Sequence, residues 1–264
     1  MIPTLFHSWL RSRSRADIGS FQTTEPVRNH RNKLVVDAAR LHRARIRRER
    51  GETLLEGPKL LSDALEAGAT VKTVFAAPGK DAPPGALLVD DQALRRLSGT
   101  ENPRGPIAVV EVPSQVEVGS LDMLVAVGVS DPGNVGTLIR IAASYAWAFA
   151  YTLGAADPWS PKVLRSGGGG QFQTPIIHLD TLPELPLVAT VVTGGVPPSE
   201  VSEDRVAVLI GEESNGLPKD VVDRAQYKVT IPTPGPTESL NASVAAGIIV
   251  NELSKRKGNW AAQV

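Results

Sequence analysis

The polar residues best spaced for chemistry lie in two segments. Each segment has an asparagine at the N-terminus of an apolar helix. DPGNVGTLIRIAAS (131–144) places Asn134 there, and IPTPGPTESLNASVAAGIIVNEL (231–253) places Ser239 and Asn241 there. Asn and Ser are common caps of helix N-termini, so either segment alone is a weak indication of a site. Because the two segments share this plan, we predict that they line two sides of one uncharged, polar site.

An acidic loop, IGEESNGLP (210–218), lies between these segments and predicts a third wall. Arg140 lies six residues after Asn134, on a helix face of Leu, Ile and Ala. It could pair with Glu213 or Asp131 in the core, because burying an unpaired cation is costly. It could instead be aimed at a phosphate or a developing oxyanion in a cleft. The residues around it leave both interpretations open.

Two further motifs are weaker. Glu212 and Glu213 could form a metal-binding pair, but adjacent residues in a loop rarely point the same way, so we expect no metal site. The run Gly167–Gly170 lacks the Lys-Ser/Thr end of a P-loop and the spacing of a dinucleotide fingerprint, so we interpret it as a flexible turn. Arg165, just before this run, is a candidate phosphate contact.

The composition separates a basic beginning from an acidic remainder. Of 28 Lys+Arg and 28 Asp+Glu in 264 residues, the first 50 residues hold 12 and 4, which leaves 16 and 24 for the rest. This asymmetry predicts a basic module for a nucleic acid or an acidic surface. The chain has no cysteine and only four scattered histidines, which argues against thiolate and zinc sites. No apolar run approaches the ~20 residues of a membrane span, so we expect a cytoplasmic protein.

A helix is predicted from residue 29 to about residue 49. Arg40, Arg43 and Arg47 recur in it at spacings of three and four and therefore share one side. A solvated charged face is the alternative, but a row of like charges costs stability unless a polyanion neutralises it. We therefore interpret this stripe as an RNA-binding surface.

Alternating short strands and helices predict an α/β protein with two domains. A disordered basic leader is expected over residues 1–25, with a transit peptide as the less favoured alternative. A small α/β domain is expected over 26–113, a linker over 114–120, and a parallel sheet flanked by helices over 121–264. Within the larger domain, residues 157–170 are expected to form a loop.

The motifs DPGNVGTLIRIAAS, VLIGEESNGLP and IPTPGPTESLNASVAAGIIVNEL resemble, in order and spacing, those of the SpoU (TrmH) family of the SPOUT superfamily. Its members are RNA ribose 2′-O-methyltransferases. Residues 121–254 resemble the catalytic domain, and residues 29–112 resemble the substrate-binding domain that many members carry. The resemblance implies a C-terminal trefoil knot, bound S-adenosylmethionine and a homodimer whose active site is completed across the subunit interface.

The resemblance also assigns roles to individual positions. The implied catalytic residues are Asn134, Arg140, Glu213, Ser239 and Asn241. The implied cofactor contacts, largely through the backbone, are Thr193, Ile210, Gly211, Ile231, Ser239 and Leu240. The candidate RNA contacts are Arg40, Arg43, Arg47, Arg140 and Arg165. Gly167 departs from the family, which commonly has a Ser there, and this leaves the RNA contact of that loop in doubt.

Together these features predict an S-adenosylmethionine-dependent RNA 2′-O-ribose methyltransferase. The additional first domain favours 23S ribosomal RNA over tRNA as the substrate, and methylation that confers antibiotic resistance is a further option. The alternative from another class is a non-catalytic RNA-binding or ribosome-assembly factor.

Overall fold

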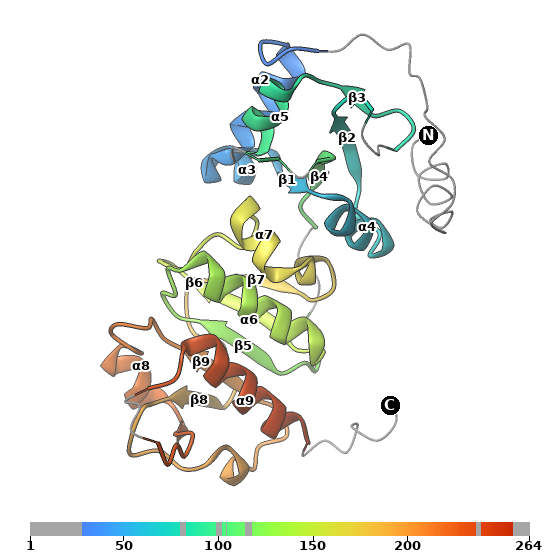
Figure 1. Cartoon of the computed structure of the whole chain (residues 1–264). Coiled ribbons are helices and arrows are strands. Elements are labelled where there is room, and N and C mark those ends of the chain that lie inside the picture. Colours follow the sequence, from blue (N-terminus) through green and yellow to red (C-terminus); the bar gives the residue numbers. More distant parts are fainter. Residues whose placement is uncertain are drawn as a thin grey trace. The chain divides into compact units, whose positions relative to one another are not determined.

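The computed structural model describes residues 28–79, 83–98, 102–103, 105–113, 118–235 and 239–255. The chain forms two compact units that divide after Pro113, with Trp159–Pro161 grouped with the first unit (Figure 1). The predicted leader and most of the predicted linker lie outside the described residues.

The first unit is a small sheet with helices. Its elements are α2 (Lys33–Ala39), the 3-10 helix η1 (Arg40–His42), α3 (Ala44–Arg50), β1 (Glu52–Glu56), α4 (Pro58–Glu66), β2 (Val71–Ala76), β3 (Leu87–Leu88), α5 (Asp91–Ser98) and β4 (Ile107–Glu111). The strand order is β1-β4-β2-β3, and β4 is antiparallel to both of its neighbours. Val35 of α2 and Leu97 of α5 pack with Phe75 of β2 in one buried cluster, so these two helices cover one face of the sheet.

The single helix predicted over residues 29–49 is wrong. The chain leaves helical geometry at Arg43 (φ −87°, ψ 123°), which ends η1 and precedes α3. Arg47 is buried and donates hydrogen bonds to the carbonyls of Leu41 (2.7 Å) and His42 (2.9 Å). Carbonyls at a helix end need donors, and here a guanidinium supplies them. Arg47 is therefore a structural residue, and the predicted continuous arginine stripe does not exist.

The second unit contains a parallel sheet, as the sequence predicts, and this sheet has six strands. Its elements are β5 (Met123–Ala126), α6 (Pro132–Ser144), β6 (Ala148–Thr152), α7 (Pro161–Gly167), η2 (Gly170–Phe172), β7 (Ile176–Leu179), β8 (Leu187–Thr190), η3 (Pro198–Glu200), β9 (Ala207–Ile210), α8 (Lys219–Arg224), β10 (Tyr227–Val229) and α9 (Ala242–Lys255). The strand order is β10-β8-β9-β5-β6-β7, with every neighbouring pair parallel.

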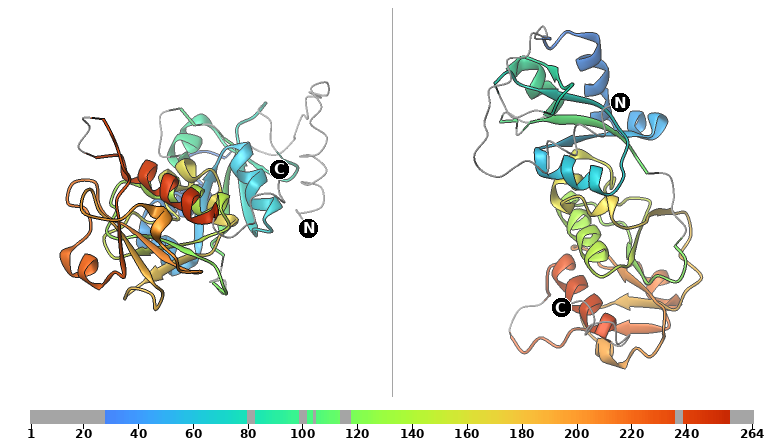
Figure 2. Two further views of the ribbon diagram at one scale, coloured as in Figure 1. Left: turned by 90° about the horizontal axis from the view of Figure 1, so that it is seen from below. Right: turned by 90° about the vertical axis from the view of Figure 1, so that its right-hand side faces the viewer.

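Both faces of this sheet are buried. Leu124 points toward a core shared with α6 and α9, which lie side by side (Figure 2), whereas Val125 points toward α8. Alternate residues of a strand face opposite sides of its sheet, which explains why β5 is apolar throughout. The part of the chain that the structure describes has no helix with the length and apolar character needed to span a bilayer.

Residues 157–170 do not form the predicted loop, because α7 occupies Pro161–Gly167. The glycine run after it makes a turn with positive φ at Gly168 and Gly169. This turn packs closely on α6, because a Cβ at Gly170 would lie 3.3 Å from the Ile139 carbonyl oxygen. The preceding helix α7 packs on α6 as well, because a Cβ at Gly136 would lie 1.9 Å from Ser166 Oγ. The glycines therefore permit close packing of the turn on α6 instead of a loose segment.

Candidate active site

The parallel sheet gathers the three motif segments at one edge. Ser130 follows β5, Glu212 follows β9 and Ile231 follows β10, and parallel strands end at the same edge. Ligands of open α/β sheets collect outside this carboxyl edge. The fold therefore places segments that lie far apart in the sequence around one location.

Asn134 is the buried member of the site, with 8% of its surface exposed. It is not the cap of α6, because Asp131 takes that position and accepts a hydrogen bond from the Asn134 backbone N–H (2.8 Å). The Asn134 side chain is thus free for other partners. Its Oδ1 accepts hydrogen bonds from Asn241 Nδ2 (3.2 Å) and Ser243 Oγ (2.9 Å).

Asn241 connects all three motifs through one amide. Its Oδ1 accepts from the backbone N–H groups of Ser243 (3.0 Å) and Val244 (3.3 Å) at the start of α9, as a cap does. Its Nδ2 donates to Asn134 and also to Glu213 Oε1. Only an amide has the acceptor and the two donors that these contacts require. Glu213, one of the residues for which the resemblance implies a catalytic role, accepts the hydrogen bond from Nδ2 and holds Asn241.

Glu212 fixes the shape of the acidic loop. Its carboxylate accepts hydrogen bonds from Asn215 Nδ2 and Ser130 Oγ (3.0 Å each), and these bonds lower the pKa of Glu212. The loop also turns tightly over Gly211, where a Cβ would lie 2.3 Å from the Gly216 carbonyl carbon. Glu212 and Glu213 bond to different partners, and no group of three potential metal ligands occurs among the described residues.

Arg140 is exposed on α6, and among the described residues it makes no ion pair. Its possible core pairing with Glu213 or Asp131 is therefore wrong. Nη1 of Arg140 lies beside Gly168, where a Cβ would be 4.0 Å away. Six residues of helix separate Arg140 from Asn134 by about 9 Å along the axis. The structure does not connect Arg140 to the Asn134 cluster within one subunit.

The other candidate residues occupy the same edge or the nearby surface. Thr193 and Ser239 are exposed, Ile231 and Leu240 are half-buried, and Ile210 and Gly211 are buried at the end of β9. All six are uncharged, and Gly194 next to Thr193 faces open space. This set fits an uncharged adenosine group that is held by backbone atoms and apolar contacts. Arg165 is exposed on α7.

Sequence reasoning missed Ser243 and Asp131. Ser243 is buried, and its hydroxyl holds Asn134. In the sequence it is one small residue among several at the start of a helix, and only its position two residues after Asn241 sets it apart. The sequence suggests Asp131 only as an ion-pair partner of Arg140, whereas in the structure it caps α6.

Comparison with known proteins matches each unit to a known protein family. Residues 122–251 match the SpoU rRNA Methylase family, and residues 32–108 match the MRM3-like substrate binding domain. An uncharacterised tRNA/rRNA methyltransferase of Synechocystis sp. is 31% identical over 94% of this chain and 97% of its own length. The 23S rRNA (guanosine(2553)-2′-O)-methyltransferase RlmP of Bacillus subtilis is 28% identical over 86% and 98%.

Solved structures agree. The AdoMet-bound rRNA methyltransferase from Sinorhizobium meliloti has a TM-score of 0.74 at 27% identity and covers 87% of this chain and 98% of its own. The SpoU methyltransferase AviRb from Streptomyces viridochromogenes, in complex with AdoMet, has a TM-score of 0.75 at 25% identity and covers 86% and 98%. The motifs gather at one sheet edge, and the Synechocystis relative is 31% identical over nearly its whole length. The chain therefore belongs to the SpoU family of RNA methyltransferases.

Proposed function

We propose that this protein transfers a methyl group from S-adenosylmethionine to a ribose 2′-hydroxyl of ribosomal RNA. One observation carries the proposal: the amide of Asn241 joins Asn134, Glu213 and the start of α9 into one polar cluster at the carboxyl edge of the sheet. The similarity to RlmP and to AdoMet-bound rRNA methyltransferases supports the reaction and the substrate class.

The cofactor would lie against the ends of β8, β9 and β10. Thr193, Ile210, Gly211, Ile231, Ser239 and Leu240 are the proposed contacts. S-Adenosylmethionine supplies an electrophilic methyl group, so the protein needs to add only orientation and charge stabilisation. Asn134 and Asn241 are held by several hydrogen bonds each, which suits them to position the reacting groups.

Arg140 is the proposed partner of the RNA at the reacting ribose. A 2′-hydroxyl loses its proton as it attacks, and a nearby guanidinium stabilises the developing alkoxide and holds the adjacent phosphate. Arginine stays protonated in proteins, so it does not take the proton. A phosphate oxygen of the RNA or a water molecule accepts it instead. The exposed position of Arg140 leaves its guanidinium accessible for this role.

We also propose that two copies of the chain share the active site. Val244 and Ile248 of α9 are exposed at 52% and 42% and lie one helical turn apart, so they form an apolar strip that a second copy would cover. Arg140 lies on α6, which packs beside α9. Because no hydrogen bond or ion pair joins the Arg140 side chain to the Asn134 cluster among the described residues, we assign it to the site of the partner copy.

The RNA substrate can be identified by mapping 2′-O-methyl groups in cytoplasmic ribosomal RNA and tRNA from cells with and without the protein. One ribosomal ribose should lose its methyl group when the protein is absent. A loss confined to tRNA would replace the proposed substrate with tRNA. Calorimetry tests the non-catalytic alternative, because a protein that binds neither S-adenosylmethionine nor its demethylated product would not be this enzyme.

A further inference from the structure

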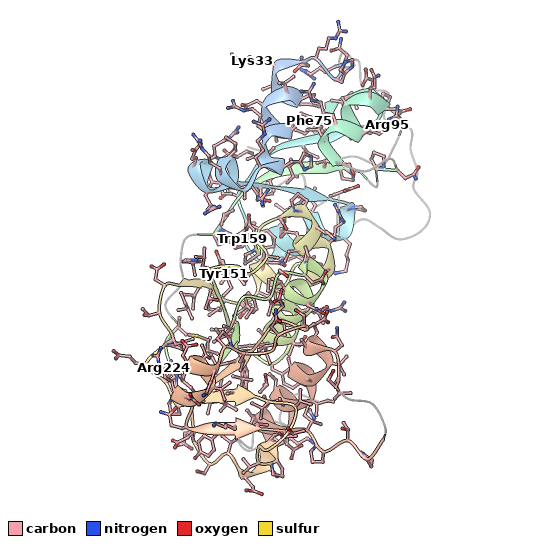
Figure 3. All side chains as sticks on the ribbon, turned by 90° about the vertical axis from the view of Figure 1, so that its left-hand side faces the viewer. Lys33, Phe75, Arg95, Tyr151, Trp159 and Arg224 are labelled. Atoms are coloured by element: carbon pink, nitrogen blue, oxygen red, sulfur yellow. The ribbon has the colours of Figure 1, made fainter. Side chains whose placement is uncertain are left out.

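A buried glutamine lies behind the glycine turn that follows α7. Gln171 of η2 is 2% exposed, and its Nε2 donates a hydrogen bond to the carbonyl of Pro158 (3.1 Å). Pro158 belongs to the loop between β6, which contains Tyr151, and α7, and Trp159 follows it (Tyr151 and Trp159 are labelled in Figure 3). The amide therefore ties the turn after α7 to the loop before it.

Gln171 also occupies the space that a side chain at Gly167 would need. A Cβ there would lie 2.8 Å from Oε1 and 2.9 Å from Nε2 of Gln171. The amide is buried and cannot move aside without losing its bond to Pro158. The φ of Gly167 is not positive, so its backbone would accept a larger residue. The Gln171 amide is thus what demands glycine here, and it accounts for the departure from the serine of the family.

Packing alone does not account for a glutamine at this place. Oε1 of Gln171 is buried and accepts no hydrogen bond from the residues that the structure describes. A buried polar atom without a partner lowers stability, and an apolar side chain of similar shape would avoid that cost. What an apolar residue could not supply is the hydrogen bond to Pro158, which holds the turn in place.

The turn that Gln171 holds lies against Arg140 of α6. A Cβ at Gly170 would be 3.4 Å from Arg140 Cα, and one at Gly168 would be 4.0 Å from its Nη1. The Arg140 side chain forms no hydrogen bond or ion pair with the described residues. Its many rotamers are therefore limited by packing, and the turn supplies packing beside the guanidinium.

We propose that Gln171 is a positioning residue for Arg140: it fixes the glycine turn, and the turn directs the guanidinium. Gln171 is buried, so it acts through the turn and not by contact with the RNA. A guanidinium that already points in the productive direction stabilises charge without being ordered at the moment of reaction. The inference rests on the proposed function, because it assumes that Arg140 contacts the RNA at the reacting ribose.

A double-variant cycle tests the pairing of Gly167 with Gln171. In Gly167→Ala the new methyl group must displace the amide and break its bond to Pro158, so the thermal unfolding midpoint should fall. When Gln171→Ala is also present the space is free, and Gly167→Ala should have little further effect. Equal effects of Gly167→Ala in both backgrounds would contradict the pairing.

The positioning role is tested by comparing Gln171→Leu with Gln173→Leu. Leucine is close to glutamine in size, so Gln171→Leu removes the hydrogen bond to Pro158 and keeps most of the packing. Gln173 lies two residues further on and is exposed, which makes Gln173→Leu the matched control. NMR of isotope-labelled arginine follows the mobility of the guanidinium, and Arg140→Lys assigns its signal. Thermal unfolding confirms that the variants are folded.

In Gln171→Leu the heteronuclear NOE of the Arg140 Nε–H group should fall toward that of an unrestrained side chain, and kcat should fall by about 10-fold. The affinity for S-adenosylmethionine, measured by calorimetry, should not change. Gln173→Leu should match the wild type in all three. An Arg140 signal as rigid in Gln171→Leu as in the wild type would overturn the proposal, and so would a weakened affinity for the cofactor. If the wild type transfers no methyl group, the proposed function fails, whereas the NMR comparison still decides whether Gln171 orders Arg140.

Discussion

At the scale of single residues, Asn241 is the centre of the site. Its Oδ1 caps α9 and its Nδ2 donates to two oxygens, on Asn134 and Glu213. A cap alone tolerates Asp, Ser or Asn. The N–H donors distinguish a functional amide from an ordinary cap. The fold supplies their acceptors, since Asn134 and Glu213 lie far from Asn241 in the sequence.

The variant Asn241→Asp separates these two roles. The carboxylate can still cap α9, so the thermal unfolding midpoint should stay close to that of the wild type. It cannot donate, and it faces the oxygens of Asn134 and Glu213, so methyl transfer should fall by about 100-fold or more. Asn251→Asp is the matched control, because the Asn251 side chain makes one hydrogen bond among the described residues, and it accepts that bond from Tyr145. Equal activity of the two variants would contradict the role of the Asn241 amide.

Glu212 offers a residue-level test of the acidic loop. Its pKa is lowered mainly by the hydrogen bond from Asn215, with a further contribution from Ser130. Because the pKa of Glu212 is lowered, these hydrogen bonds stabilise the loop fully at pH values above the ordinary pKa of Glu. The stabilisation is lost as the pH falls through the lowered pKa. In Asn215→Ala, the pKa of Glu212 should rise toward its ordinary value. Carbon NMR of the carboxyl group across an acid titration measures this, and an unchanged pKa would show that Asn215 is not its main cause.

At the scale of elements, the sequence predicted most helices and strands but misplaced two segments. Apolar strands and Ala-rich helices have clear periodicity, and the parallel sheet followed from their alternation. The helix at Pro161–Gly167 was missed because Pro and Gly bound it. The break at Arg43 was missed because nothing in the local pattern shows that Arg47 turns inward to bond the carbonyls of η1. The cluster around Asn134 was expected as a group, whereas Ser243 became visible only through its contacts.

The contact between α6 and α7 gives an element-level prediction. A methyl group at Gly136 would lie 1.9 Å from Ser166 Oγ and 2.8 Å from the Gly167 nitrogen. Gly136→Ala should therefore push α7 away and lower the free energy of unfolding by about 1–3 kcal/mol, although Ala favours helices. Thr137→Ala, at the exposed neighbouring position, should leave it nearly unchanged. Urea unfolding measures both, and a neutral Gly136→Ala would show that the two helices can separate freely.

At the scale of the whole molecule, the active site shared between two copies is a prediction. The knot implied by the family resemblance also stays a prediction. The exposed strip of Val244 and Ile248 and the isolated Arg140 point to a second copy, because each lacks a partner among the described residues of its own subunit.

Mixing two inactive variants tests the shared site. If Arg140 of one copy completes the Asn241 cluster of the other, a mixed dimer of Arg140→Ala and Asn241→Asp has one site with both defects and one site with neither. Activity should then return when the variants are unfolded and refolded together, and not when either is refolded alone. No recovery, in a sample where mass spectrometry detects mixed dimers, would place both residues in the same subunit's site.

The central claim is methyl transfer to a ribose 2′-hydroxyl, and the most direct measurement follows the methyl group itself. The protein is incubated with ribosomal RNA that lacks the modification and with S-adenosylmethionine carrying a trideuterated methyl group. The RNA is then digested to nucleosides for mass spectrometry. The account predicts that the label appears on the ribose of one nucleoside with the wild-type protein and is absent with Asn241→Asp. Label on a base, or equal labelling with both proteins, would contradict it.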